Sequence, residues 1–300
     1  MDMTQNKCCR HGANLRRRRR RCRKILRSII FSCSIIAVAV FVAVGSSMIR
    51  SGDGRTNKYD VEAGNNTYDN AVIENSKISV KNKIQNNQSM LDDIMNSTQY
   101  PKQLQELALK NEEAIEFVYD YPTEHVKEHT IDLTEEASMD SVPLFVQWDK
   151  RWGYEKYSGN FFAASGCGPT TLSMVVVYLT HNREASPIAV AKYSKEAGYS
   201  VDGSGSSWTL ISEGCMHYGV KAKAVALDES RMKAELDEGH PIVVNVGPGD
   251  FTDTGHFMVI TGYDDEGFSI NDPNSIEKSG KRWLFRNISS QIRAVWSMYV

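Results

Sequence analysis

An uncharged stretch of 22 residues, Ser28 to Ile49, divides this 300-residue chain into two unequal parts. A helix that crosses a membrane needs about 20 apolar residues. The stretch follows a basic segment, residues 1–27, which includes six consecutive arginines, Arg16 to Arg21. Basic residues keep their flank of a membrane helix in the cytoplasm. We therefore expect a cytoplasmic tail over 1–27, one transmembrane signal-anchor helix over 28–49, and an extracellular remainder.

A cleaved signal peptide is the alternative for the same stretch. Ala43, Val44 and Gly45 resemble the small residues of a cleavage site. The apolar stretch is longer than a usual signal core, which favours the anchor. Both alternatives export the rest of the chain, which is secreted if the segment is cleaved.

The formal net charge of −2 conceals an uneven distribution of charge. Residues 1–27 hold eleven of the 35 Lys and Arg and one of the 37 Asp and Glu, which leaves 24 basic and 36 acidic side chains, a formal −12, in the remainder. An acidic domain repels a polyanion. We therefore expect the membrane, through the N-terminal helix, and not nucleic acid, as a partner.

The exported part consists of two segments that differ in composition. Residues 50–97 are rich in Asn, Ser, Asp and Lys, without a sustained apolar period, which predicts a disordered stalk. Residues 98–300 are predicted to fold as one domain, with helices first and an antiparallel sheet after them, an α+β fold. The clearest predicted elements are helices over 169–180, 187–197 and 208–218 and strands over 241–246, 257–263 and 268–271.

Only two of the six cysteines, Cys167 and Cys215, lie in this domain. Two cysteines do not make a disulfide framework. They could still form a single disulfide in an oxidising compartment. That disulfide is the main alternative to a reactive thiol.

Cys167 stands between Gly166 and Gly168, directly before Pro169 and an apolar run that is predicted to be helical. The dipole of a helix lowers the pKa of a thiol at its N-terminus. The flanking glycines permit a tight turn and leave room for a substrate backbone beside the sulfur. These features favour a nucleophile over a buried structural cysteine.

Of the seven histidines, only His256 begins a predicted core strand. A carboxylate or amide at the end of the next strand could bind the far nitrogen of its ring. If Asp264 pairs with Gly267, Asn271 shares a face with His256, whereas a register shifted by one residue, or a bulge, places Asp272 there. The residues alone leave both possibilities open.

Gln147 carries a side-chain amide that could donate to an oxyanion beside the backbone N–H of Cys167. The segment GSGSSW, residues 203–208, is a candidate lining for a groove. The sequence contains no phosphate-binding Gly-Lys-Ser/Thr loop and no Cys-x-x-Cys or His-Glu-x-x-His spacing. We therefore expect no metal and no other cofactor.

Four segments, VPLFVQWDKRWG, SGCGPTTLSMV, GHFMVITGY and NDPNS, stand in the order Gln, Cys, His, Asp. They resemble the papain-like cysteine peptidases and are most similar to stand-alone relatives of the peptidases that trim double-glycine leaders from bacteriocins, peptidase family thirty-nine. The resemblance covers about Tyr100 to Val300. It implies a papain-like fold, with Cys167 as nucleophile, His256 as general base and acid, Asp272 as the residue that orients the histidine, and Gln147 in the oxyanion hole.

The resemblance also implies hydrolysis of peptide bonds. Leader-processing members are joined to ABC transporters on the cytoplasmic side, whereas this sequence contains no ATPase motif and its domain is expected outside. An extracellular peptide, a protein or a cell-wall peptide is therefore the expected substrate. The alternatives are a catalytically silent papain-like module that binds at the cell surface, and a cell-wall amidase or transpeptidase that uses the same triad.

Overall fold

The computed structural model describes residues 66–300, with side chains described at residue 79 and from residue 81 onward. The expected cytoplasmic tail, the expected membrane helix and the first part of the expected stalk lie outside the described residues. Within 66–300, no helix is both long and apolar enough to cross a membrane.

The first half of the described chain is mainly helical. Its elements are α2 (Asn66–Asn96), α3 (Lys102–Lys110), η1 (Glu112–Ala114), α4 (Ile115–Tyr119), α5 (Tyr121–Glu124), α6 (Thr134–Ser138), β1 (Lys156–Tyr157), β2 (Asn160–Phe161), α7 (Phe162–Ser165), α8 (Cys167–Thr180), α9 (Pro187–Glu196), β3 (Ser200–Val201), β4 (Gly205–Ser206), α10 (Thr209–Ser212) and η2 (Gly214–Tyr218).

The second half supplies the main sheet. Its elements are β5 (Lys221–Ala224), α11 (Glu229–Asp237), β6 (Ile242–Val246), β7 (His256–Asp264), β8 (Gly267–Asn271), α12 (Ile276–Ser279), β9 (Arg282–Trp283), α13 (Phe285–Ile288), η3 (Ser289–Gln291) and β10 (Ile292–Tyr299). The predicted α+β order, with helices before an antiparallel sheet, is confirmed.

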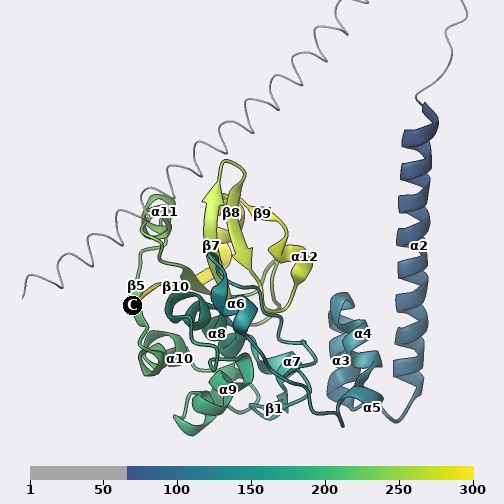
Figure 1. Cartoon of the computed structure of the whole chain (residues 1–300), viewed down its shortest axis with the longest axis horizontal. Helices are drawn as coiled ribbons and strands as arrows, with labels where there is room; N and C mark the ends of the chain where they lie inside the picture. The colour runs from purple at the N-terminus through teal and green to yellow at the C-terminus, as the bar shows by residue number, and fades with distance from the viewer. Residues whose placement is uncertain (1–65) are drawn as a thin grey trace, which may run out of the picture. The chain divides into compact units, whose positions relative to one another are not determined.

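The main sheet has six strands in the order β5-β10-β6-β7-β8-β9, and every neighbouring pair is antiparallel (Figure 1). Because successive side chains of a strand point to opposite faces, β6 and β7 contribute to two cores. Val243 and Phe257 pack into the core that contains α8 and α9, whereas Val244 and Met258 pack with Met232 of α11. The centre of the sheet is therefore buried on both faces.

Helix α8 is the central element of the helical half. It contacts α9 on one side and β7 on the other, and its residues Gly168 to Val177 are all buried. A helix that is apolar all round belongs in a core. It begins two residues before Pro169, so Cys167 occupies its first position. The core therefore places the cysteine beside the start of β7.

Residues 66–96 form the helix α2, where the sequence predicts a disordered stalk as far as residue 97. The prediction is wrong for this segment. Near the end of the helix, Met90, Leu91 and Ile94 lie three or four residues apart, which brings them to one helical face. Ile94 is fully buried and packs with Leu104 and Val118. The folded domain therefore begins before residue 98, because this face needs the helices that follow as its partner.

Candidate active site

Cys167 is the first residue of α8 and is partly exposed. Burial raises the pKa of its thiol, but a hydrogen bond with His256 and the charge of that residue lower the pKa more. The backbone N–H groups of Phe257 and Gly168 donate to the sulfur and act in the same direction. The net result is a thiol whose pKa lies below its ordinary value.

The two glycines beside Cys167 are required by packing within the protein. A Cβ atom at Gly168 would lie 2.6 Å from Ser206 Oγ, and a Cβ atom at Gly166 would lie 2.6 Å from the ring of Phe162. The sequence predicts that these glycines leave room for a substrate. In the structure they let the β3–β4 hairpin and α7 pack closely against the start of α8, and room for a substrate stays a prediction.

His256 and Asp272 form a buried pair. The distance between His256 Nε2 and Asp272 Oδ1 is 2.7 Å, and Asp272 has no exposed surface. Burial lowers the pKa of His256, but the charge and hydrogen bond of Asp272 outweigh it and raise the pKa from 6.5 to about 10. Because Nε2 contacts Asp272, Nδ1 is the ring nitrogen that remains for Cys167. The lowered thiol pKa and the raised imidazole pKa together favour a thiolate–imidazolium pair.

A bulge in β7 decides which residue meets His256. Asp264 pairs with Gly267, but the register shifts by one residue at Thr261, so that Val259 pairs with Asn271. Side chains alternate along a strand, so the shift moves Asn271 to the opposite face. There Asn271 Nδ2 donates to the carbonyl oxygens of Val142 at 3.1 Å and of Pro143 at 3.0 Å. Of the two residues that the sequence leaves open, the structure places Asp272 against His256.

Gln147 lies next to this group without facing the cleft. It is 4 % exposed, its backbone N–H donates to the carbonyl oxygen of Pro273 at 2.7 Å, and its Nε2 donates to that of Ala163 at 2.7 Å. Among the described residues, its buried Oε1 atom has no hydrogen-bond partner. Gln147 therefore joins the loop after Asp272 to α7, and its part in an oxyanion hole stays a prediction.

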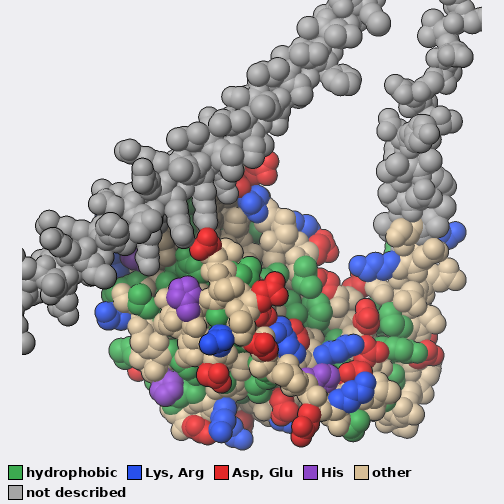
Figure 2. Space-filling view, viewed as in Figure 1, with side chains coloured by type: hydrophobic (Ala, Val, Ile, Leu, Met, Phe, Trp, Pro, Cys, Tyr) green, Lys and Arg blue, Asp and Glu red, His purple; other side chains and the backbone are tan. Residues whose placement is uncertain are grey.

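Cys167 lines a cleft of about 690 Å³. Three groups of segments surround it: residues 158–160 with 164–165, the hairpin 203–206 with Trp208, and residues 245–248 with 254–255 and Arg293. The sequence-based assignment of residues 203–208 to a groove is thus confirmed. On the face shown in Figure 2, acidic and basic side chains are interspersed. The cleft differs, because Arg293 is the only Lys, Arg, Asp or Glu among the described residues that line it.

The β3–β4 hairpin is anchored from β1 and the turn after it. Tyr157 places its hydroxyl 2.8 Å from Ser194 Oγ and 2.6 Å from Ser206 Oγ. Ser158 accepts from the Gly205 N–H at 3.0 Å and donates to the Val201 carbonyl oxygen. These contacts hold one wall of the cleft in place.

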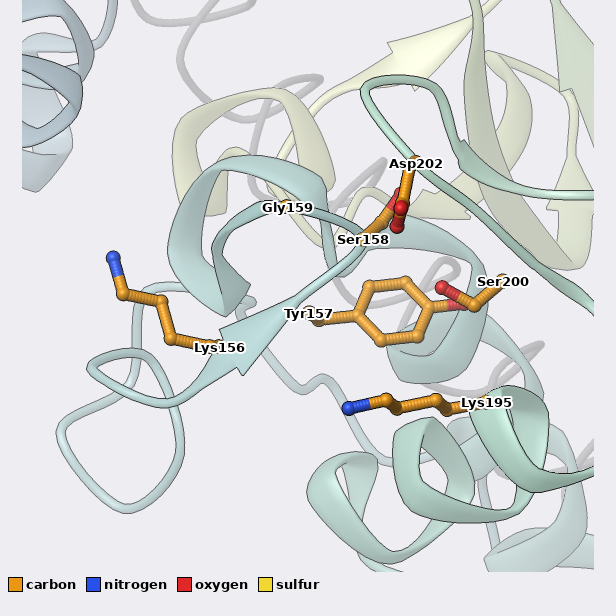
Figure 3. Close-up of a pocket in the computed structure, with 7 residues that line it drawn as sticks. All are labelled: Lys156, Tyr157, Ser158, Gly159, Lys195, Ser200 and Asp202. Atoms are coloured by element: carbon orange, nitrogen blue, oxygen red, sulfur yellow. The ribbon is translucent and has the colours of Figure 1, made fainter.

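A smaller pocket of about 180 Å³ adjoins the cleft and shares Ser158 and Gly159 with it. In Figure 3, Lys195 extends below the ring of Tyr157, whereas Lys156 points away from the pocket. The Lys156 ammonium lies 3.2 Å from the centroid of the Phe161 ring, and burial lowers its pKa. This pocket is therefore adjacent to the cleft, and neither Cys167 nor His256 lines it.

Cys167 and Cys215 are both free thiols, so the structure does not contain the disulfide that the sequence leaves open. Cys215 is fully buried in the core around α8, and burial raises its pKa to about 11. The pKa values of the two thiols are thus shifted in opposite directions. Within the described part of the chain, no three His, Cys, Asp or Glu side chains are placed to hold a metal ion.

Two residues of this region are missed by reasoning from the sequence. Trp148 Nε1 donates to the carbonyl oxygen of Asn274 at 3.2 Å and so supports the loop that carries Asp272. Arg293 reaches the cleft from a bulge in β10. The position of Trp148, an aromatic residue next to Gln147, could have indicated its role in the site. The bulge that directs Arg293 to the cleft is not marked by any feature of the sequence.

The second half of the chain is similar to known proteins. The Peptidase_C39 like family matches residues 139–300, more than half of the chain. Curated proteins provide no match. The peptidase domain of Streptococcus ComA, a bi-functional ABC transporter involved in a quorum-sensing pathway, is 18% identical, with 53% of this chain and 96% of that chain covered and a TM-score of 0.39. A C39-like peptidase from Bacillus anthracis is 16% identical over 53% of this chain and 95% of that chain, with a TM-score of 0.34.

Proposed function

Because the chain belongs to the Peptidase_C39 like family, we propose that it is a cysteine peptidase that hydrolyses peptide bonds with Cys167 as its nucleophile. The observation that supports this most is the chain of contacts from Cys167 through His256 to Asp272. A nucleophilic thiol needs a base beside it and a third group that orients the base. The shifts of the two pKa values favour the charged pair that is ready to react.

In the proposed reaction, the Cys167 thiolate attacks the carbonyl carbon of a substrate amide, and a C–S bond forms. As the C–N bond breaks, the proton on His256 Nδ1 passes to the leaving nitrogen, and a thioester remains. Neutral His256 then accepts a proton from water as the water oxygen attacks the thioester. The thiolate leaves, a carboxylic acid is released, and the imidazolium is restored.

Two donors are proposed for the oxyanion of this reaction, the backbone N–H of Cys167 and the side-chain amide of Gln147. An amide nitrogen carries two hydrogens. One of those on Gln147 Nε2 is directed at the carbonyl oxygen of Ala163. The other would have to be turned toward a tetrahedral intermediate at Cys167, because Gln147 does not line the cleft in this structure.

The test uses the full chain under reducing conditions with a mixture of short synthetic peptides, analysed by mass spectrometry. We expect hydrolysis by the wild type and none by Cys167→Ala or His256→Ala. Iodoacetamide should label Cys167 and leave the buried Cys215 unmodified. Labelling of Cys215 alone would contradict the assignment. Absence of hydrolysis would favour a silent binding module, and transfer of the acyl group to an added amine would favour a transpeptidase.

The extracellular, membrane-anchored location also remains a proposal, which residues 1–49 support by their basic flank and uncharged stretch. In cells that express the full chain, protease added outside should digest the domain. The fragment left behind should stay with the membrane. A domain protected from the added protease would contradict this location.

A further inference from the structure

Arg293 reaches the cleft because it is the extra residue of a bulge in β10. Ile292 pairs with Val246 and Ala294 pairs with Asn245, which leaves Arg293 without a partner residue on β6. A bulge re-aims a side chain that would otherwise follow the alternation of the strand. Strand β10, which lies beside β6, therefore presents one arginine to the cleft that Cys167 lines.

The guanidinium of Arg293 fits against a glycine. A Cβ atom at Gly247 would lie 3.1 Å from Arg293 Nη2 and 2.8 Å from Arg293 Nε, and the second distance is shorter than real Cβ contacts. Gly247 follows directly after β6, whose last residue, Val246, pairs with His256. Gly247 thus leaves the space that the guanidinium occupies.

Arg293 also has unused hydrogen-bond donors. Its Nη1 donates to the carbonyl oxygen of Ser290 at 2.9 Å, and within residues 66–300 no carboxylate forms an ion pair with it. Asp250, in the loop beside Gly247, is held instead by Gln291, with 2.6 Å between Gln291 Nε2 and Asp250 Oδ2. A guanidinium has five N–H donors in a fork that matches a carboxylate.

We propose that Arg293 binds a carboxylate of the substrate, so that the cleft prefers acidic peptides. The carboxylate is that of an Asp or Glu side chain, or the free C-terminus, at a fixed distance from the bond that Cys167 attacks. This inference rests on the proposed peptidase function and adds the class of substrate to it. In a cleft whose other described lining residues carry no Lys, Arg, Asp or Glu, this contact is the main electrostatic determinant of specificity.

The first experiment identifies the position of the acidic residue. The full chain is incubated with a mixture of short peptides in which every position varies, and the cleaved bonds are read by mass spectrometry. A preferred peptide is then made with Glu or Gln at that position, and with a free or an amidated C-terminus. We expect kcat/KM to fall by about fivefold to tenfold on the change from Glu to Gln, or on amidation if the terminal carboxylate is the ligand.

Variants at Arg293 provide the decisive comparison. In Arg293→Gln the Glu and Gln peptides should be cleaved equally, and Arg293→Glu should prefer a Lys peptide. Gly247→Ala should weaken the preference by displacing the guanidinium. The matched control is Arg286→Gln, which removes an exposed arginine outside the cleft and should leave the preference intact. An acidic preference that survives in Arg293→Gln, or no acidic preference in the wild type, overturns the inference.

Failure of the proposed function is recognised separately. If the wild type hydrolyses no peptide, the same mixture is passed over the immobilised Cys167→Ala chain, and retained peptides are identified. Enrichment of acidic peptides on Cys167→Ala supports the carboxylate site without catalysis if it is lost in the double variant Cys167→Ala/Arg293→Gln. Retention without that enrichment, or no retention, overturns it.

Discussion

His256 and Asp272 lie on one face of the sheet because Thr261 is an extra residue in β7, which shifts the pairing of β7 with β8 by one residue. Their 2.7 Å contact is therefore a consequence of backbone geometry as well as of side-chain type. Asn271, one residue earlier, points to the opposite face and binds the segment that contains Val142 and Pro143. Two adjacent residues thus have separate roles, one electrostatic and one structural.

The first prediction compares Asp272→Ala with Asn271→Ala. Loss of Asp272 removes the group that raises the pKa of His256, so less imidazolium is present to stabilise the thiolate, and kcat/KM should fall by about 10²-fold or more. Loss of Asn271 removes two hydrogen bonds and should lower the free energy of unfolding by about 1–3 kcal/mol. The rate of Cys167 alkylation by iodoacetamide, measured against pH, separates them. Only Asp272→Ala should alter that profile, and an equal change in both would assign Asp272 a structural role.

The second prediction concerns stability and pH. The pKa of His256 is raised in the folded protein, from 6.5 to about 10, so its contribution to stability is fully present below pH 6.5. The contribution is lost as the pH rises from 6.5 through 10. The difference in free energy of unfolding between the wild type and His256→Gln should therefore shrink over this range. Denaturant unfolding at a series of pH values measures it, and a difference that grows with pH would show that the histidine is neutral when folded.

Local sequence signals predict the part of the site that depends on neighbouring residues. Gly166 to Pro169 marks the start of α8, and the short apolar runs in β6 and β7 mark buried strands of the sheet. Helix starts and buried strands are determined by a few adjacent residues, so these elements lie close to where the sequence predicts them. The same locality places His256 at the first position of β7.

The remaining features depend on contacts between distant segments. The bulges at Thr261 and Arg293 are one-residue shifts in pairing, and nothing in the identity of a threonine or an arginine marks them. Helix α2 is polar along most of its length, and the apolar side chains described as packing on the domain lie in its last turns, so its composition resembles that of a disordered segment. The hydrogen bond of Gln147 to Ala163 likewise depends on how α7 packs.

The third prediction tests the packing of the hairpin against α8. Gly168→Ala places a methyl group against Ser206 Oγ and Cβ, so we expect a loss of about 1–3 kcal/mol in the free energy of unfolding and reduced activity. Ser206→Gly removes the atoms in the way and should restore much of both in the double variant. Gly262→Ala is the control, because a Cβ there meets no atom within 4 Å. Additive losses in the double variant would show that the two residues do not interact.

The fourth prediction separates the two possible roles of Gln147. If its amide donates to the oxyanion, Gln147→Ala should lower kcat by about 10²-fold, because the donor acts only in the transition state. Alkylation of Cys167 by iodoacetamide forms no oxyanion, so its rate and pH profile should stay within about twofold of the wild type. If Gln147 only holds α7 in place through Ala163, the position of Cys167 changes and both rates should fall together. The ratio of the two rates, measured on the same preparation, therefore decides between a catalytic donor and a positioning residue.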